Sequence, residues 1–240
     1  MKNMKGFVFD LDNTLFDHYG TITKIIIDNY EVIRPYINPA YDPEMAADHI
    51  CHTESKYLLL DGSWGPIYDA LVKEYFFHPD NIPDRNKCFS YMAQAHARIS
   101  VNFSFTRDLL LKMKEKGYKL GIITNGACSL QNSKIDNLGF RDLFDVVVVS
   151  GEYAQKICGD ERNHTYYKPD TGIFLYAAEL LGEKPGSLYY VGDNPANDVM
   201  GAKKAGYVPI WVRSRSPWSL GMEDYPQNVV KTIKDLERFL

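Results

Sequence analysis

The sequence predicts an α/β fold in which a central parallel sheet is flanked by helices and interrupted by a helical insertion. Three observations lead to this prediction. Short runs of consecutive apolar residues recur along the chain, helical segments that end in glycine separate most of them, and one long stretch has helical patterns but no such run. Runs that are apolar on consecutive residues are typical of strands covered on both faces, as in a parallel sheet.

The predicted strands are rich in β-branched and aromatic residues, which suit a pleated, buried surface. They are residues 6–10, 119–125, 145–150, 187–193 and 207–212. Helical patterns fill the intervals between or after them, and each has a glycine at or just after its end, where a left-handed cap is common. These helices are predicted at residues 106–117, 128–139, 170–182 and 194–206. Alternating strands and helices favour right-handed crossovers within one parallel sheet.

The insertion follows the first predicted strand. Residues 19–102 contain helical patterns separated by proline- and glycine-rich turns, and no convincing buried strand. We therefore expect residues 1–18 and 103–240 to form the α/β core domain and residues 19–102 to form a separate helical domain. Most of the aromatic residues of this insertion are expected to pack in its interior, although they also suggest a substrate pocket. They include Tyr57, Trp64, Tyr68, Tyr75, Phe76 and Phe77.

Composition excludes several classes of function. The formal net charge is −4 and no long run of like charge occurs, so binding to a nucleic acid polymer is not expected. No apolar stretch is long enough to cross a membrane, and the N-terminal residues do not have the pattern of a secretory signal. The four cysteines show no paired spacing, which is typical of free thiols in a reducing compartment. A cytoplasmic protein, either a monomer or a homodimer, is the expectation.

Polar residues follow three of the predicted strands. Asp10 and Asp12 come directly after the first strand, Thr124 and Asn125 end the second, and Asp193 ends the fourth. In open α/β sheets, ligands bind beyond the carboxyl ends of the strands, so these side chains are expected to meet. Carboxylates gathered there would repel one another unless a cation lay between them. Oxygen ligands of this kind suit Mg²⁺.

Such a cluster can support phosphoryl transfer. Threonine and asparagine side chains can hydrogen-bond phosphate oxygens, and Lys168, in the loop before the predicted 170–182 helix, can offset charge on a phosphate and on Asp10. An aspartate held in this way can attack phosphorus and form an acyl phosphate. A second carboxyl group, Asp12, can protonate the leaving oxygen and later deprotonate a water molecule.

Four ordered segments carry a resemblance to a known family. They are "DLDNT" (10–14), "IITNG" (122–126), the lysine of "YYKPD" (166–170) and "VGDNPAND" (191–198). Together they resemble the motifs of the haloacid dehalogenase-like (HAD) hydrolase superfamily. The resemblance covers residues 1–18 and 103–240 and implies a Rossmann-like α/β core. The insertion occupies the place of a small α-helical C1 cap domain in this family.

The resemblance implies a role for each matched residue. Asp10 matches the nucleophile, and Asp12 matches the general acid/base, with its backbone carbonyl on Mg²⁺. Thr124 matches the phosphate-binding threonine, with Asn125 beside it as a further substrate-binding residue. Lys168 matches the lysine that orients the nucleophile and the phosphate. Asp193 matches an acidic metal ligand that acts together with Asp10 and Asp12. Asp198 matches a second acidic residue that lies behind the metal ligands.

One departure from the family pattern concerns the loop before Lys168. Residues 151–167 form a longer segment than is usual before this lysine, and the sequence does not reveal its role. Lys156 is an alternative candidate for the motif lysine. The "KPD" context and the helix expected after it favour Lys168.

The sequence therefore predicts an Mg²⁺-dependent phosphatase that hydrolyses a small phosphorylated metabolite through an aspartyl-phosphate. A nucleoside monophosphate or a sugar phosphate is the expected substrate, by resemblance to pyrimidine 5′-nucleotidases and phosphoglycolate phosphatases. Three alternatives stay open: a phosphomutase of the β-phosphoglucomutase type, a 2-haloacid dehalogenase and a non-catalytic binding member. Asp12 and Asp193 argue against the dehalogenase, and the presence of every motif residue argues against the non-catalytic member.

Overall fold

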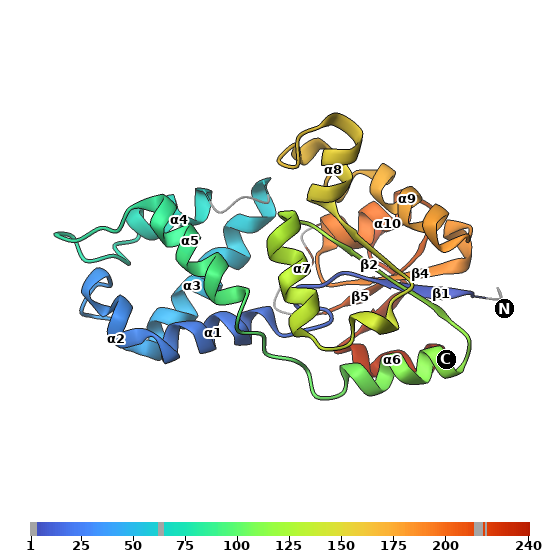
Figure 1. Cartoon of the computed structure of the whole chain (residues 1–240), viewed down its shortest axis with the longest axis horizontal. Coiled ribbons are helices and arrows are strands. Elements are labelled where there is room, and N and C mark those ends of the chain that lie inside the picture. Colours follow the sequence, from blue (N-terminus) through green and yellow to red (C-terminus); the bar gives the residue numbers. More distant parts are fainter. Residues whose placement is uncertain (1–3, 62–64, 214–217, 219) are drawn as a thin grey trace. The chain divides into compact units, whose positions relative to one another are not determined.

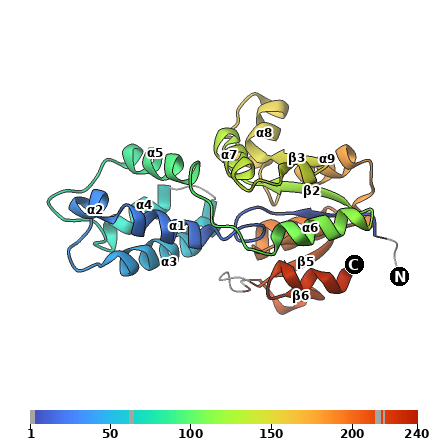
Figure 2. The same cartoon turned by 60° about the horizontal axis from the view of Figure 1, so that its bottom comes forward.

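The computed structural model describes residues 4–61, 65–213, 218 and 220–240. Within it the chain forms two compact units: Met1–Asp17 together with Asn102–Leu240, here called the core unit, and His18–Val101, here called the cap unit. The elements of both units are labelled in Figures 1 and 2. None of the helices in the described part of the chain is both long and apolar enough to span a membrane.

The core unit is built on a six-stranded sheet in the order β3-β2-β1-β4-β5-β6. All neighbouring strands pair in parallel. The strands are β1 (Gly6–Phe9), β2 (Lys119–Thr124), β3 (Val146–Val149), β4 (Leu188–Gly192), β5 (Val208–Val212) and β6 (Asn228–Val230). Five of these agree with the predicted strands to within one or two residues, and β6 was not predicted. The parallel sheet predicted from the apolar runs is therefore confirmed.

Helices flank both faces of this sheet (Figures 1 and 2). They are α6 (Thr106–Glu115), α7 (Cys128–Asn137), α8 (Ser150–Cys158), α9 (Thr171–Leu181) and α10 (Gly201–Lys204). α8 lies in the long loop before Lys168 and was not predicted. α10 follows a single π-helical stretch, Pro195–Met200, where the sequence predicted a regular helix. The short 3₁₀ segments include Arg141–Leu143, His164–Tyr166, Pro185–Ser187, Met222–Asp224 and Ile233–Phe239.

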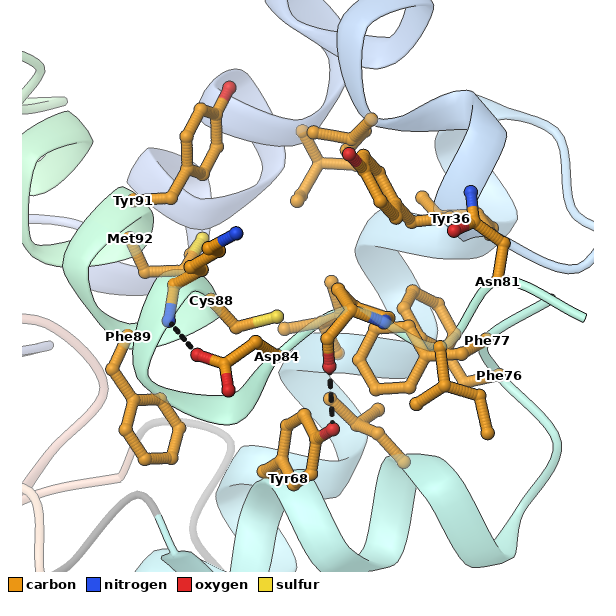
Figure 3. A pocket seen from close by; sticks show the side chains of 18 of the residues that line it. Tyr36, Tyr68, Phe76, Phe77, Asn81, Asp84, Cys88, Phe89, Tyr91 and Met92 are labelled. Atoms are coloured by element: carbon orange, nitrogen blue, oxygen red, sulfur yellow. Dashed lines mark hydrogen bonds between the residues drawn. The ribbon is translucent and has the colours of Figure 1, made fainter. Parts of the chain in front are cut away.

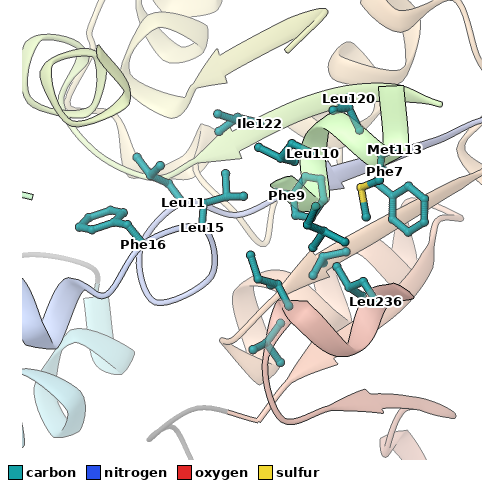
Figure 4. Packing of buried hydrophobic residues seen from close by; sticks show 14 of the residues in the cluster. Phe7, Phe9, Leu11, Leu15, Phe16, Leu110, Met113, Leu120, Ile122 and Leu236 are labelled. Carbon is teal, nitrogen blue, oxygen red and sulfur yellow. The ribbon is translucent and has the colours of Figure 1, made fainter. Parts of the chain in front are cut away.

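Side chains of β1 alternate between two hydrophobic cores, as the period of a strand requires. Phe7 and Phe9 point to one face, where they pack with residues of α6 and the C-terminal 3₁₀ helix, among them Leu110 and Leu236 (Figure 4). Val8 points to the other face and packs against the apolar side of α9. All four residues of β1 are buried, so the strand that leads to Asp10 is held rigidly from both sides.

The regular elements described in the cap unit are helices, joined by loops that include one antiparallel bridge between Ile37 and Phe77. Its helices are α1 (His18–Asp28), α2 (Tyr30–Ile33), α3 (Pro43–Asp61), α4 (Gly65–Lys73) and α5 (Arg85–His96), with a 3₁₀ turn at Arg34–Tyr36. Its core contains Ile22 and Ile26 of α1 together with Ala47 and Cys51 of α3. These residues recur at helical spacing, so each helix buries one stripe.

A cavity of about 540 Å³ lies within the cap unit and is lined mainly by aromatic and aliphatic side chains (Figure 3). Tyr68, Phe76 and Phe77, three of the aromatic residues noted in the sequence, contribute to this lining. Tyr68 Oη donates a hydrogen bond to the carbonyl oxygen of Pro83 at 2.7 Å. By contrast, Tyr75 is 76% exposed. Trp64 lies outside the described residues.

Candidate active site

The carboxyl ends of β1, β2 and β4 meet at one edge of the sheet. β1 lies between the other two strands, with Phe9 in register with Ile122 on one side and with Val191 on the other. The backbone N–H of Asp10 continues the ladder by donating to the carbonyl oxygen of Val191 at 2.8 Å. This register brings Asp10, Thr124 and Asp193 to the same edge.

A tight turn directs the chain away from the sheet after Asp10. Asn13 adopts a left-handed conformation (φ 57°), which asparagine tolerates better than most residues. The N–H of Leu15 then donates to the carbonyl oxygen of Leu11 at 3.0 Å. Both leucines are completely buried in the core cluster of Figure 4, so they anchor the turn on either side of Asp12.

Lys168 is the centre of the buried hydrogen-bond network. Its ammonium donates to Asp10 Oδ1 at 2.5 Å, to Asp198 Oδ1 at 2.7 Å and to Tyr190 Oη at 3.0 Å. The Lys168 side chain is only 3% exposed. Tyr190 Oη in turn contacts the carbonyl oxygen of Ile123 at 3.2 Å. Because its three donors are all engaged, the ammonium is fixed in one position beside Asp10.

Asn125 holds the backbone of Lys168. The Asn125 side-chain amide donates to the Lys168 carbonyl oxygen at 3.0 Å, and its Oδ1 accepts from the Lys168 N–H at 2.8 Å. Asp170 then caps α9 by accepting from the Gly172 N–H at 3.0 Å. The sequence placed Asn125 among the phosphate-binding groups, whereas its side chain is occupied with positioning the lysine.

Lys156, the alternative motif lysine, lies elsewhere. It belongs to α8, and its ammonium contacts Tyr176 Oη at 2.8 Å in an exposed pair. Of these two lysines, Lys168 is therefore the one that contacts Asp10.

Three carboxylates converge at the ends of β1 and β4. Asp10, Asp193 and Asp198 each offer an oxygen, and these oxygens lie within 4.8 Å of one another. The three residues are all buried. Asp198 fits there because residue 192 is glycine: a Cβ at this position would come within 2.4 Å of Asp198 Cγ. Asp198 Oδ2 also accepts from the Asn194 N–H at 2.9 Å, which fixes the π-helical turn behind β4.

The charges of this cluster do not balance. Burial raises the pKa of Asp10 well above its ordinary value, and the neighbouring carboxylates Asp198 and Asp193 raise it further, against the opposing charge of Lys168. Burial by itself lowers the pKa of Lys168, but Asp10 and Asp198 more than reverse this effect, so its pKa is raised. The lysine therefore stays protonated, while an ionised Asp10 lacks sufficient positive charge around it.

A divalent cation fits this arrangement. If all three carboxylates are ionised, they carry three negative charges against one ammonium, which leaves two charges uncompensated. The oxygen-only donor set suits a hard cation such as Mg²⁺, which typically uses few protein carboxylates. Asp10 and Asp193 are the candidate side-chain ligands, because Asp198 already accepts from Lys168 and from Asn194.

Asp12 makes contacts that the sequence did not reveal. Its Oδ1 accepts from the ammonium of Lys134 at 2.7 Å, and its Oδ2 accepts from the amide of Gln131 at 3.0 Å. The same Gln131 amide donates to Thr124 Oγ1 at 2.6 Å. Both new residues belong to α7, three positions apart and thus on one helix face. That spacing is the only signal in the sequence that could have indicated them.

The fold and the site together define a hydrolase with an α/β core and a helical insertion after its first strand. The profile of the haloacid dehalogenase-like hydrolases matches residues 4–206. The chain belongs to this family of hydrolases.

Two relatives with named activities and one solved structure are similar to this chain. Glyceraldehyde 3-phosphate phosphatase from Methanopyrus kandleri is 36% identical over 211 residues, which cover 88% of this chain and 84% of the relative. Pyrimidine 5′-nucleotidase YjjG from Escherichia coli is 30% identical over 128 residues, which cover 51% of this chain and 49% of the relative. The HAD-hydrolase YfnB from Bacillus subtilis, solved with bound magnesium, superposes with a TM-score of 0.75 at 18% identity and covers 100% of this chain and 99% of its own.

Proposed function

We propose that this protein is an Mg²⁺-dependent phosphatase of small phosphorylated metabolites and that it works through an aspartyl-phosphate on Asp10. The observation that carries the proposal is the buried Lys168 ammonium, which donates one hydrogen bond each to Asp10, Asp198 and Tyr190 amid an excess of buried carboxylates. An ion pair that served stability alone would not need the further acidic group Asp193, whose charge raises the pKa of Asp10.

The substrate class follows from what the relatives are named for. Glyceraldehyde 3-phosphate and pyrimidine 5′-nucleotides both carry their phosphate on a primary carbon next to a carbon that bears an oxygen atom. We propose a primary phosphoester of this kind, either a sugar phosphate or a nucleoside monophosphate, as the substrate. We also propose that the enzyme acts in the cytoplasm.

The proposed reaction has two steps. In the first, Asp10 Oδ attacks phosphorus, the bond from phosphorus to the leaving oxygen breaks, and Asp12 transfers its proton to that oxygen. In the second, Asp12 takes a proton from a water molecule, whose oxygen attacks phosphorus, and the bond to Asp10 breaks to release phosphate. The product alcohol and phosphate account for every atom of substrate and water.

The surrounding residues stabilise charge during both steps. Mg²⁺, when bound by Asp10, Asp193 and the backbone carbonyl of Asp12, would neutralise charge on the phosphoryl oxygens and on the nucleophile. Lys168 keeps Asp10 oriented and contributes positive charge beside it. The Thr124 hydroxyl would donate to a phosphoryl oxygen, and Asn125 would act indirectly by holding Lys168.

A panel assay tests this function. Phosphate release from sugar phosphates and nucleoside monophosphates is measured with Mg²⁺ and with EDTA, for the wild type and for Asp10→Asn. We expect Mg²⁺-dependent release by the wild type and a loss of about 10⁴-fold or more in kcat for the variant. Hydroxylamine should convert the acyl phosphate of the wild type into a hydroxamate at residue 10, with release of phosphate, and should form no hydroxamate in the variant.

The matched control is Asp136→Asn, which changes an exposed aspartate on α7 that pairs with Arg141. It should behave as the wild type does. Full activity in Asp10→Asn would refute the proposed nucleophile. Isomerisation of a sugar phosphate without net phosphate release would identify a phosphomutase instead.

A further inference from the structure

Two residues of α7 connect the ends of β1 and β2. Gln131 donates to Asp12, which follows β1, and to Thr124, which ends β2, while Lys134 donates to Asp12. Gln131 is 2% exposed and Lys134 is 5% exposed, so both polar side chains are buried at this place. Lys134 lies with its ammonium 2.7 Å from Asp12 Oδ1 and 5.8 Å from the centre of the Phe16 ring. Burying an ammonium is unfavourable unless it is paired, and Asp12 provides the pairing.

The two contacts fix the carboxyl group of Asp12 in orientation. One oxygen accepts from Lys134 and the other accepts from Gln131, so the plane of the carboxyl group is held at two points. Both donors come from a helix whose Ile135 is packed in the main core cluster, which limits their own movement. A general acid/base has to lie within hydrogen-bond reach first of the leaving-group oxygen and then of the attacking water molecule. The orientation of its carboxyl group therefore affects both proton transfers.

Gln131 also sets the direction of the Thr124 hydroxyl group. The amide nitrogen of Gln131 has two hydrogens, and its contacts use Asp12 Oδ2 at 3.0 Å and Thr124 Oγ1 at 2.6 Å. Because Thr124 Oγ1 accepts this hydrogen bond, the hydrogen of the hydroxyl group is directed toward another acceptor. A phosphoryl oxygen is the acceptor that the proposed reaction would bring.

From this geometry we infer that Lys134 and Gln131 are positioning residues of the reaction. Lys134 holds Asp12 for proton transfer, and Gln131 holds Asp12 while it turns the Thr124 hydroxyl toward the substrate phosphate. The inference rests on the proposed phosphatase function. It predicts that Lys134 affects kcat through Asp12 alone, whereas Gln131 affects both kcat and the binding of the phosphate.

The test uses p-nitrophenyl phosphate as the probe with the full chain and saturating Mg²⁺. The nitrophenolate leaving group of this probe needs little help from an acid. The burst of nitrophenol therefore reports formation of the aspartyl-phosphate, and the later steady-state rate reports hydrolysis of the aspartyl-phosphate. Lys134→Met should leave the burst rate within about threefold of the wild type and slow the steady state by about 10- to 100-fold, with KM within about threefold. Lys134→Arg should restore part of the loss.

A double-mutant comparison separates positioning from a merely structural role. In the Asp12→Asn background, Lys134→Met should change the steady state by less than about threefold, because the group through which it acts is already lost. The same 10- to 100-fold drop in that background would overturn the inference. Lys112→Met, which removes an exposed lysine paired with Glu237, is the control and should not alter either phase.

Gln131→Met gives an independent test that does not depend on the stability of the Lys134 variants. It should lower kcat and raise KM by about 10-fold each, and the rise in KM should disappear when Thr124 is already changed to Val. An unchanged KM would overturn the role assigned to Gln131. The proposed function itself fails if Asp10→Asn stays active or if the enzyme isomerises a sugar phosphate without net phosphate release, so an inactive Asp10→Asn with an unaffected Lys134→Met refutes the inference alone.

Discussion

The edge of the core sheet and the cavity of the cap unit differ both in chemistry and in burial, because the lining of the cavity includes exposed side chains such as Val32 and Ile82. At the edge, Asp10, Asp193 and Asp198 are buried around one lysine, and the pKa of Asp10 is raised by burial and by its neighbours. In the cap cavity the lining is mostly aromatic and aliphatic. The edge therefore costs stability through uncompensated charge, whereas the mainly apolar lining of the cavity carries no such cost.

This difference predicts how each region responds to substitution. Removing positive charge from the edge should be harmful, whereas removing negative charge from it should stabilise the fold. In the cap cavity only volume should matter. The following four tests address this contrast, beginning with the largest expected effect.

Lys168→Met should lower the free energy of unfolding by about 3–5 kcal/mol, because it leaves Asp10 and Asp198 buried without their cation. Urea denaturation measures the change. The control is Lys156→Met, whose exposed lysine contacts Tyr176, and it should leave the unfolding transition unchanged. Equal stability of the two variants would contradict the charge balance described for the edge.

Ile67→Ala should lower the free energy of unfolding by about 3 kcal/mol, since it removes a buried side chain beside an existing cavity. Hydrogen exchange of peptides from α4 should become faster. Ile27→Ala, at a position on α1 that is 39% exposed, serves as the control and should change stability by about 0.5 kcal/mol or less. A loss at Ile67 no larger than at Ile27 would show that packing around the cavity is loose.

Mg²⁺ should raise the free energy of unfolding by about 2.7 kcal/mol at a concentration 100 times its dissociation constant, because it binds the folded state only. Thermal melts with Mg²⁺ or EDTA measure the shift. Asp193→Asn should abolish most of the shift, while Asp136→Asn should retain it, since Asp136 is exposed on α7. A full shift in Asp193→Asn would place the cation elsewhere.

Asp10→Asn should raise the free energy of unfolding in EDTA by about 1 kcal/mol near neutral pH, although we expect it to abolish activity. The pKa of Asp10 is raised in the folded state, so the folded protein binds the proton more tightly than the unfolded chain does. Wild-type stability therefore falls as pH increases from the unfolded pKa of about 4 toward the raised folded value.

The advantage of this variant should accordingly vanish below about pH 4, where the carboxyl group is protonated in both states. Urea titrations at pH 4 and pH 7.5 check the sign. A wild type that gains stability relative to Asp10→Asn on going from pH 4 to pH 7.5 would show that ionised Asp10 is favourably compensated without a metal ion.

The sequence was sufficient for the sheet because buried parallel strands leave a local signal. The consecutive apolar residues of β1 and β2 and the glycines after α7 and α9 indicated these elements directly. β6 was missed because it is a three-residue strand at the sheet edge and two of its residues are partly exposed, which leaves no apolar run. The helix α8 was missed because it was interpreted as part of an unusually long loop.

The sequence placed together the candidate site residues that directly follow strands. It missed the residues whose position depends on which face of a helix is turned toward the site. Asp10, Thr124 and Asp193 could be placed together because register is a property of the sheet. Gln131 is 119 residues from Asp12, and nothing local shows which face of α7 turns toward it. Nor could the sequence reveal that Asn125 would be occupied by the backbone of Lys168, because that loop has no regular period.

The central position of β1 also has a consequence for biosynthesis. This strand is synthesised well before its two neighbours, β2 and β4, which begin at residues 119 and 188. An apolar strand with both edges open invites wrong pairing, and these partners are distant in sequence, which slows the search for them. β1 therefore cannot complete its pairing on both sides until β4 has been synthesised, so dependence on a chaperone is to be expected during synthesis.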